Sequence, residues 1–423
     1  MLNREPDSIS RPNHRVGICY VATDVLVPYF TGASTHVLEA SKNLMAVGAS
    51  VFVLSRRASH AQAAEEVVEG VPIRRMFRGI VLPVPARKFT EHRPGLPTRS
   101  WAQNLIVRLY SLYLSTVQAL LGGLVAARII VKNGLDVVLE RETSFGAGAV
   151  ASLLTGRPLV LEANGPRFNR FSLSRATKIL AYSYSMVDER VRRKTELMHS
   201  GVNPELFRPD LESRSTIRSR HELLLSPVIG YVGTFQAWHG LEDLVQASRA
   251  VLQSFPEAKF LMVGPGSDQT RALTEKLGVR ASFVFTDAVP YAQVPMYINA
   301  ADILVSPTNP SGAPWTLKYG PPAQIKILEY MACRKPVIST DTEPSRRIVR
   351  NGITGITVPP GDPKALSEAI CRLIRAPALA DELADHAYTL VTERYTWAAH
   401  ADELYQTILT AMRDYSGRSR KVG

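Results

Sequence analysis

Short apolar runs alternate with helix-forming segments in two separate stretches of this chain, and this alternation constrains the fold more than any other feature. In the first stretch, strands are predicted over residues 16–20 and 50–54, with a helix over 35–47 between them. The second stretch begins at Val228 and continues to Arg375. Strands that are apolar throughout and alternate with helices are typical of parallel sheets covered on both faces. The pattern therefore predicts an α/β protein with two doubly wound units.

The length of the chain agrees with two units. At 423 residues it is too long for one compact core, and two or three domains are expected. Charged residues replace the apolar periodicity between Glu205 and Pro227, which predicts a linker there. Two further strands are predicted over residues 136–141 and 158–163, and each has charged residues near its end, where a ligand site would lie.

Composition narrows the function classes. The chain is 45% hydrophobic and 21% charged, as an ordinary globular protein is. Its formal charge of +12 implies attraction to anions, which could be nucleic acid, lipid headgroups or nucleotide phosphates. The basic residues cluster in residues 74–99 and near the C-terminus, away from interleaved aromatics, so no nucleic-acid partner is expected and an anionic membrane surface is preferred.

The cysteines and the N-terminus bear on the compartment. Cys19, Cys333 and Cys371 each lie in an apolar context without pairable or metal-like spacing, so we expect buried thiols in a reducing compartment. Residues 1–14 are polar and of mixed charge, which predicts a flexible leader and not a signal peptide. A cytoplasmic location is expected, with peripheral attachment to the inner face of the membrane as an option.

A long helix is predicted from Ser100 to Val131, with apolar residues on more than one face. Arg108 near its start and Arg128 and Lys132 near its end argue against a membrane-spanning helix. Two interpretations remain open, namely burial in the first domain or an interfacial helix that contacts a membrane.

One carboxylate stands out in the second stretch. Glu329 lies inside the apolar helix-forming run of residues 324–332, and a short buried strand follows at 336–340. A helix that begins at a pocket and leads into a strand is the usual anatomy of an α/β ligand site. Glu329 is therefore a candidate ligand-binding residue.

The ordered set of motifs resembles the family 4 retaining glycosyltransferases, which have the GT-B fold. In the first half, Gly32 with His36 and Val37 resembles the family's first glycine loop and helix, and residues 201–209 resemble its inter-domain signature. In the second half the resemblance is carried by residues 228–235, 236–245, 255–266, 284–289, 294–307, 324–341 and 351–362.

The resemblance implies two Rossmann-like domains and a C-terminal helix that crosses back to the first domain. An acceptor-binding domain would span residues 15–205, a nucleotide-sugar-binding domain 206–395 and the crossover helix 396–415, with a basic tail over 416–423.

The resemblance also implies a donor site. Glu329 would accept hydrogen bonds from the ribose hydroxyls, because a carboxylate has two acceptor oxygens. Gly32, Val289 and Ile327 are assigned to the same site, Val289 through backbone contacts near the base. The donor would be a UDP- or GDP-linked sugar, and no cofactor is implied.

Three positions depart from the family pattern. Thr234 and His239 stand where the family usually has an Arg and a Lys for the diphosphate, so Lys326 is our candidate for the missing charge. The family has a pair of glutamates separated by seven residues; Glu329 is the second, and Pro321 stands at the position of the first. Backbone amides over residues 320–325 would take over the contact with the sugar.

On the acceptor side, Arg141 is assigned to phosphate contact and Glu162 to polarisation of an acceptor hydroxyl, although each could also be a salt bridge at a strand end. His239 completes the catalytic set. In this family retention is generally explained by attack from the leaving-group side with the diphosphate as base. No metal site is predicted, because no His and Asp pair has metal-ligand spacing.

Three other functions remain open. Gly264 and Gly266 follow a strand as in a dinucleotide-binding oxidoreductase, but Gln269 stands at the third glycine position. A sugar-nucleotide epimerase of GT-B architecture is the second. The third is a catalytically silent nucleotide-sugar-binding scaffold, which Thr234 and Pro321 would favour. Turnover in the presence of an acceptor separates them, because only a transferase releases free nucleoside diphosphate.

Overall fold

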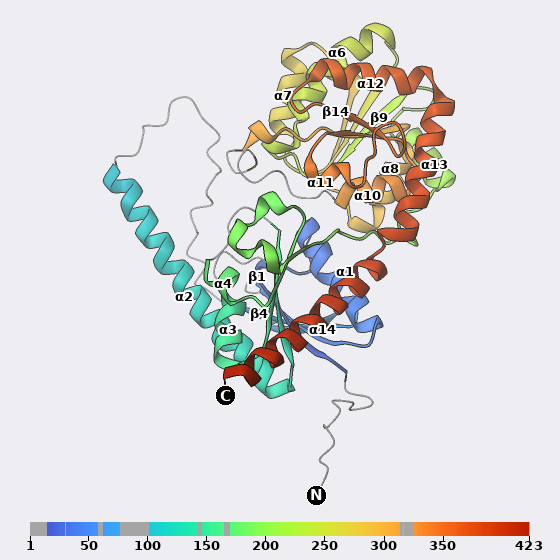
Figure 1. The fold of residues 1–423 in the computed structure, drawn as a ribbon. Helices are drawn as coiled ribbons and strands as arrows, with labels where there is room; N and C mark the ends of the chain where they lie inside the picture. The colour runs from blue at the N-terminus through green and yellow to red at the C-terminus, as the bar shows by residue number, and fades with distance from the viewer. Residues whose placement is uncertain are drawn as a thin grey trace, which may run out of the picture.

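The computed structural model of the protein has two α/β domains (Figure 1). The structure describes residues 15–29, 31–57, 62–76, 101–141, 146–164, 170–313, 316 and 325–422. The predicted leader, most of the basic stretch 74–99, and Pro321 lie outside the described residues.

The first domain is built on a largely parallel sheet. Among the described residues it has eight strands in the order β3-β4-β2-β1-β5-β6-β7-β8, and β3 and β4 form its antiparallel pair. The strands are β1 (Gly17–Leu26), β2 (Ser50–Arg56), β3 (Glu65–Val68), β4 (Val71–Met76), β5 (Val137–Arg141), β6 (Leu159–Ala163), β7 (Lys178–Ala181) and β8 (Thr195–Leu197). Its helices are α1 (Gly32–Ala46), α2 (Trp101–Asn133), α3 (Ala147–Thr155) and α4 (Arg170–Arg175).

The second domain has a six-stranded parallel sheet over the described residues, in the order β11-β10-β9-β12-β13-β14. The strands are β9 (Val228–Val232), β10 (Lys259–Val263), β11 (Phe283–Asp287), β12 (Ile303–Ser306), β13 (Val337–Thr340) and β14 (Ile356–Val358). The helices are α5 (Leu211–Arg220), α6 (Leu241–Ser254), α7 (Asp268–Lys276), α8 (Val294–Ala300), α10 (Ile325–Ala332), α11 (Glu343–Arg346), α12 (Pro363–Arg375) and α13 (Pro377–Arg394).

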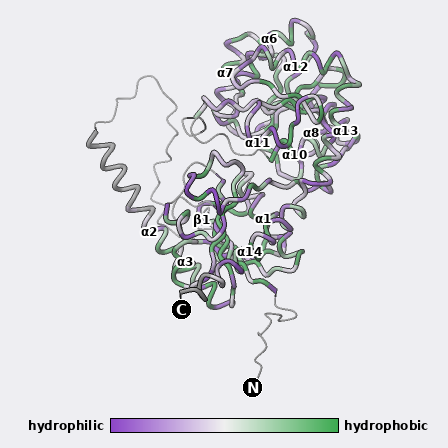
Figure 2. Tube along the Cα trace, viewed as in Figure 1, coloured by the Kyte–Doolittle hydropathy of each residue, from purple (hydrophilic) through white to green (hydrophobic). Residues whose placement is uncertain are grey.

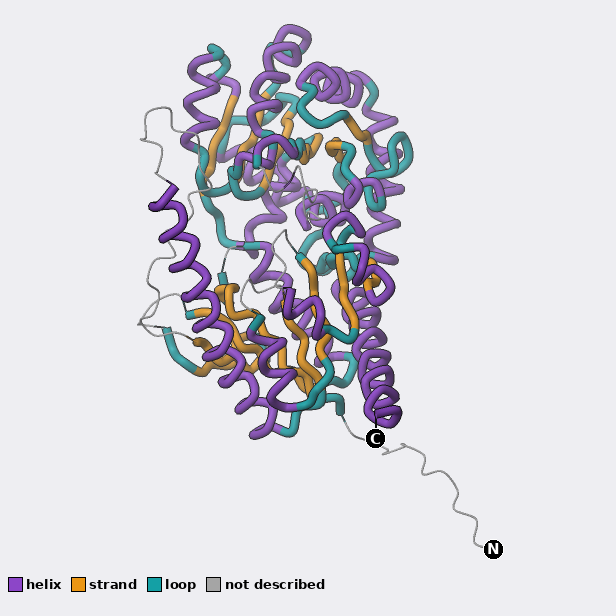
Figure 3. Tube along the Cα trace, turned by 60° about the vertical axis from the view of Figure 1, so that its left-hand side comes forward, coloured by secondary structure: helices purple, strands orange, loops and turns teal. Residues whose placement is uncertain are grey.

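Both sheets are sandwiched between helices, as the fully apolar strands predicted (Figures 1 and 3). Hydrophobic stretches lie in the interior of both domains (Figure 2). Cys19, Cys333 and Cys371 are buried free thiols, as expected. The α/β prediction with two doubly wound units is confirmed.

The last helix, α14 (Trp397–Val422), returns from the second domain to the first. It packs on α1 and lies against β6 and β7. Its side chains Ala401, Leu404, Ile408 and Ala411 belong to the same core as β1 and β2. The crossover that the family resemblance implied is therefore present.

Several boundaries differ from the predictions. The segment between Glu205 and Pro227, which was expected to be a linker, contains α5, and this helix packs on α8 of the second domain. β1 continues to Leu26 instead of ending at Tyr20, and α1 begins at Gly32 instead of Thr35. The basic tail predicted over residues 416–423 is helical through Val422, because arginine and lysine favour helices and no proline interrupts α14.

The long helix α2 was predicted correctly, and Figure 1 shows its N-terminal part extending away from the first sheet. No helix in the described ranges is long and apolar enough to cross a membrane.

Candidate active site between the two domains

The second sheet reverses its strand order between β9 and β12, and ligands of α/β proteins bind at the carboxyl ends of strands at such a point. The loops that follow these two strands meet there. The Asn309 backbone N–H donates to the Trp238 carbonyl oxygen at 3.0 Å. Gly240 has a φ of 65°, and a Cβ on it would lie 1.6 Å from the Pro307 carbonyl oxygen. Only glycine fits this crossing, so the loops form a rigid floor for a site.

Lys326, in the first turn of α10, extends toward this floor. Its Nζ donates to the hydroxyl of Tyr231 at 2.9 Å, and a Cβ at Gly233 would lie only 2.8 Å from that Nζ. Gly233 therefore leaves room for the ammonium group. Desolvation lowers the pKa of Lys326 to about 7, although the charge of Glu329 opposes this shift.

Glu329 lies one turn further along α10 and is 8% exposed. The hydroxyl of Tyr291 donates to its Oε1 at 2.9 Å. Burial raises the pKa of Glu329 to about 7, against the opposing effects of the Tyr291 hydrogen bond and Lys326. A nearly buried carboxylate beside a partly buried ammonium group is the kind of perturbed pair that gathers at functional sites.

His239 and Thr234 belong to the same cluster. The Thr234 carbonyl oxygen lies 2.5 Å from His239 Nδ1, so this nitrogen carries the proton and donates to it. The Tyr231 hydroxyl donates to the same carbonyl at 2.7 Å. Burial and Lys326 lower the pKa of His239 well below its usual value, so the imidazole is neutral. The cluster therefore places its positive charge on Lys326.

Ile327 and Val289 have supporting positions. Ile327 is 2% exposed and lies in the hydrophobic core of the second domain, so its side chain anchors α10. Val289 packs partly buried against the same core. Any contact of these two residues with a ligand would therefore involve their backbone atoms.

Gly32 brings the first domain to the same place. It is the first residue of α1, and a Cβ on it would lie 3.5 Å from Cδ1 of Ile325, the first residue of α10. The N-termini of α1 and α10 therefore face each other across the domain boundary. Helix N-termini present free backbone N–H groups and a positive dipole end, which suits a bound phosphate.

The first sheet has its own reversal of strand order, between β1 and β5. A cavity of about 350 Å³ opens beside it, lined by Asp24, Val25, Leu26, Tyr29, Thr31, Ala33, Arg141 and Asn164. Arg141, the last residue of β5, thus lies at the carboxyl end of its strand and lines a cavity, as predicted from the sequence. Asp24 was missed, because the predicted strand ended at Tyr20 and left Asp24 in a loop without a signal of its own.

Glu162 does not line this cavity. Its side chain is fully buried, with its oxygens 2.5 Å from the Tyr20 hydroxyl and 3.2 Å from His36 Nε2. Burial alone would raise its pKa, but His36 and Arg141 outweigh it and hold the pKa of Glu162 at about 2. The predicted contact of Glu162 with an acceptor hydroxyl is not what this arrangement offers, because the carboxylate has no route to solvent. Asp24 is the acidic residue on the cavity wall.

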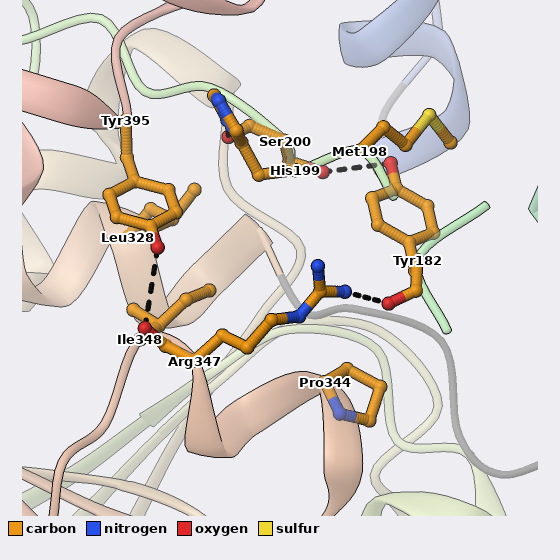
Figure 4. A pocket seen from close by; sticks show the side chains of 9 residues that line it. All are labelled: Tyr182, Met198, His199, Ser200, Leu328, Pro344, Arg347, Ile348 and Tyr395. Carbon is orange, nitrogen blue, oxygen red and sulfur yellow. Dashed lines mark hydrogen bonds between the residues drawn. The ribbon is translucent and has the colours of Figure 1, made fainter. Parts of the chain in front are cut away.

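The two domains meet at a hinge that contains a small cavity of about 70 Å³ (Figure 4). From the second domain, the Arg347 guanidinium donates to the Tyr182 carbonyl oxygen. The Tyr182 hydroxyl bonds Ser200 at 2.9 Å, and the Tyr395 hydroxyl donates to the Arg347 carbonyl oxygen at 3.3 Å. Of these bonds, the one between Arg347 and Tyr182 joins the two domains.

Comparison with known proteins agrees with this geometry. A family model described as glycosyl transferases group 1 matches residues 226–376. An alpha-D-kanosaminyltransferase of Streptomyces kanamyceticus is 26% identical, over 61% of this chain and 74% of that protein. A putative teichuronic acid biosynthesis glycosyltransferase of Bacillus subtilis is 27% identical, over 63% of this chain and 68% of that protein. Residues 226–376 are thus identified as a group 1 glycosyltransferase domain.

Solved structures place the whole chain in the GT-B fold. Anabaena HepE, solved in complex with UDP and glucose, superposes with a TM-score of 0.68 at 16% identity, covering 94% of this chain and 100% of that one. At this identity the likeness concerns the fold. The family match spans the domain that carries α10, the Gly233 loop and both switch-point strands.

Proposed function

We propose that this glycosyltransferase moves a sugar from a nucleotide-diphosphate donor to a glycan or lipid-linked acceptor, with retention of configuration. The observation that carries the proposal is the pair Lys326 and Glu329 on α10, at the switch point of the second sheet and opposite Gly32. The ammonium group of Lys326 and the N-termini of α1 and α10 suit the charges of a diphosphate, and the carboxylate of Glu329 suits the hydroxyls of a ribose.

The donor would bind with its ribose hydroxyls on Glu329 and its diphosphate near Lys326. The leaving diphosphate gains charge as the glycosidic bond breaks, so a fixed cation there stabilises the transition state more than the ground state. Lys326 and the N–H groups of α1 and α10 can supply this charge, which is why we propose metal-independent transfer. His239, which is neutral and bonded to Thr234, positions the loop that carries Gly233.

The acceptor would bind in the cavity at the first switch point, with Arg141 and Asp24 on its wall. Retention would follow from attack on the side of the leaving group, with a phosphate oxygen taking the acceptor proton. The donor sugar is a hexose linked to UDP or GDP in this proposal, and the pathway is cell-surface polysaccharide or glycolipid synthesis.

The exposed apolar residues of the first domain support a lipid-linked acceptor. They form the α2–α4 surface, which consists of Leu120, Leu121, Leu124 and Val131 of α2, Leu153 and Leu154 of α3, and Phe171 of α4. Exposed Arg128, Lys132, Arg157 and Arg170 accompany them. Apolar side chains among cations suit an anionic membrane surface, so we propose peripheral attachment at the cytoplasmic face.

Thermal stabilisation by UDP-, GDP-, ADP- and TDP-sugars tests the donor site. A donor at a hundredfold excess over its dissociation constant adds about 2.7 kcal/mol to the stability of a protein that binds it. We expect one nucleotide class to raise the melting temperature of the wild type. Lys326→Ala and Glu329→Gln should each lose this shift, whereas Lys364→Ala, at a residue that is 86% exposed, should keep it. Equal shifts in all four proteins would refute the assignment.

The reaction products of the same protein distinguish the transferase from the epimerase and from the silent scaffold. With donor and acceptor present, a transferase releases free nucleoside diphosphate and an epimerase gives an isomeric sugar nucleotide. Donor binding with neither product would support the silent scaffold.

A further inference from the structure

A second cluster of chemically active side chains lies inside the first domain, behind the acceptor cavity. His36 of α1, Glu162 of β6 and His400 of α14 each offer one ligand atom, and these three atoms lie within 4.8 Å of one another. All three residues are buried, with exposed fractions of 0%, 0% and 2%. They are 126 and 238 positions apart along the chain, so their spacing gave no metal signal and the prediction of no metal site could not anticipate them.

One polar atom of the cluster has no partner. His400 Nδ1 lies 2.7 Å from the His199 carbonyl oxygen, so Nδ1 carries the proton and Nε2 is left with a lone pair. Nε2 is buried and has no hydrogen-bond partner among the described residues. A buried acceptor without a donor is costly, and it calls for an explanation such as a bound ion.

The other two ligands are already set for coordination. His36 presents Nε2 to Glu162 Oε1 at 3.2 Å, while its Nδ1 lies 3.4 Å from the Tyr182 hydroxyl. Two ligands at about 2.0 Å from a tetrahedral zinc ion are separated by about 3.3 Å, so this pair needs little movement to share a metal. His400 is the ligand that would have to move closer to the other two.

Outer-shell bonds support the same ligands. The Tyr20 hydroxyl donates to Glu162 Oε2 at 2.5 Å, and the His199 carbonyl orients the His400 ring. Metal-ligating histidines almost always donate their second ring N–H to such an acceptor. Trp397 covers the cluster, with its ring centroid 5.4 Å from that of His36 and 5.5 Å from that of His400.

We propose that His36, Glu162 and His400 form a transition-metal site, suited best to Zn²⁺, which fastens α14 to the first domain. Two imidazoles and a carboxylate are a ligand set that zinc prefers, and its three elements come from the beginning, the middle and the end of the chain. The positive charge of Arg141 also lowers the pKa of Glu162. A bound ion would share this carboxylate with Arg141 and would replace the hydrogen bond between His36 and Glu162. The site is structural in this proposal and stands independently of the donor site.

The test uses the full chain, stripped with a chelator and titrated with Zn²⁺ or Co²⁺. We expect one equivalent of zinc by elemental mass spectrometry, a rise in melting temperature, and the visible absorption of tetrahedral Co²⁺. His400→Gln should lose all three. His386→Gln, which changes an exposed histidine of α13, should keep them.

Two outcomes would overturn the proposal. One is a folded wild-type protein that takes up no zinc and no cobalt. The other is unchanged metal uptake in His400→Gln and in a second variant, His36→Gln. The first outcome is measured on the wild type alone, so the proposal can be refuted even if a variant fails to fold. Donor-induced stabilisation, measured in parallel, reports separately on Glu329.

Discussion

At the scale of single residues, the proposed donor site contains two groups whose pKa values converge. Desolvation lowers the pKa of Lys326 from 10.5 to about 7 and raises that of Glu329 from 4.5 to about 7. Above pH 7 the lysine loses the charge that attracts a diphosphate. Below pH 7 the carboxylate gains a proton and accepts fewer ribose hydrogen bonds. The two groups interact, so the apparent values belong to the pair.

We therefore predict that affinity for the nucleoside diphosphate is greatest near pH 7 and falls on both sides, by up to about tenfold per pH unit. Lys326→Ala should remove the alkaline decline, and Glu329→Gln the acidic one. Calorimetric titration at several pH values checks this. The free nucleoside, which has a ribose and no phosphate, is the control ligand, and for it the alkaline decline should be absent in the wild type. A flat profile for the diphosphate would contradict the assignment of both residues.

The structure brings the donor-side residues named from the sequence together, whereas on the acceptor side it buries Glu162. Glu329 stood out because it interrupts a run of apolar residues, and Lys326 was chosen because Thr234 and His239 replace the cations of the family pattern. Arg141 followed from the rule that ligand sites lie at strand ends. Glu162 obeyed the same rule, yet the rule does not say whether a side chain turns outward, and Tyr20 and His36 hold this one inside. Those partners come from other elements and could not be inferred from spacing.

At the scale of elements, the hinge consists of two chain passages that run side by side. The Val202 N–H donates to the Tyr395 carbonyl oxygen at 2.8 Å, and the Trp397 N–H donates to the Val202 carbonyl oxygen at 3.2 Å. Gly201 makes this approach feasible, since a Cβ on it would lie 2.6 Å from both Cα and N of Trp397. The inter-domain signature noted in the sequence therefore has a steric basis.

We predict that Gly201→Ala lowers the stability of the protein by about 1–3 kcal/mol, because backbone cannot yield to the added methyl group. The melting temperature, followed by circular dichroism, measures this loss. Gly417→Ala is the matched control, because nothing lies within 4 Å of a Cβ there, and α14 should gain slightly from alanine. A Gly201→Ala protein as stable as the wild type would show that the hinge can open at no cost.

At the scale of the whole molecule, net charge and the α2–α4 surface act together. The formal charge of +12 draws the protein toward anionic surfaces, and the exposed leucines of α2 and α3 can then insert. Neither feature specifies a membrane alone, since exposed apolar side chains are common on soluble proteins.

We predict sedimentation with phosphatidylglycerol vesicles at low salt, weaker sedimentation at high salt, and little with phosphatidylcholine. A Leu121→Glu, Leu154→Glu double variant should bind at least tenfold more weakly. Leu225→Glu, at a fully exposed leucine of the second domain, should bind nearly as the wild type does. Indifference to lipid charge would exclude an anionic membrane surface as the partner.

The architecture of the whole molecule was the most predictable property, because the strand and helix alternation and the motif order both specify it. The course of α14 past Met412 was not, since residues 413–422 lack a hydrophobic periodicity that would show whether they continue the helix. Burial of His400 was equally hidden, because a histidine in a mixed segment predicts a surface position.

The return of α14 to the first domain bears on how the protein is made. Ala401, Leu404, Ile408 and Ala411 fill the same core as the first two strands, which are separated from them by more than 340 residues of chain. During translation, β1 and β2 are synthesised first and the side chains of α14 last. The domain that begins synthesis therefore cannot close its core until the second domain has already emerged, and a nascent chain stopped before Trp397 would leave that core open to solvent and to chaperones.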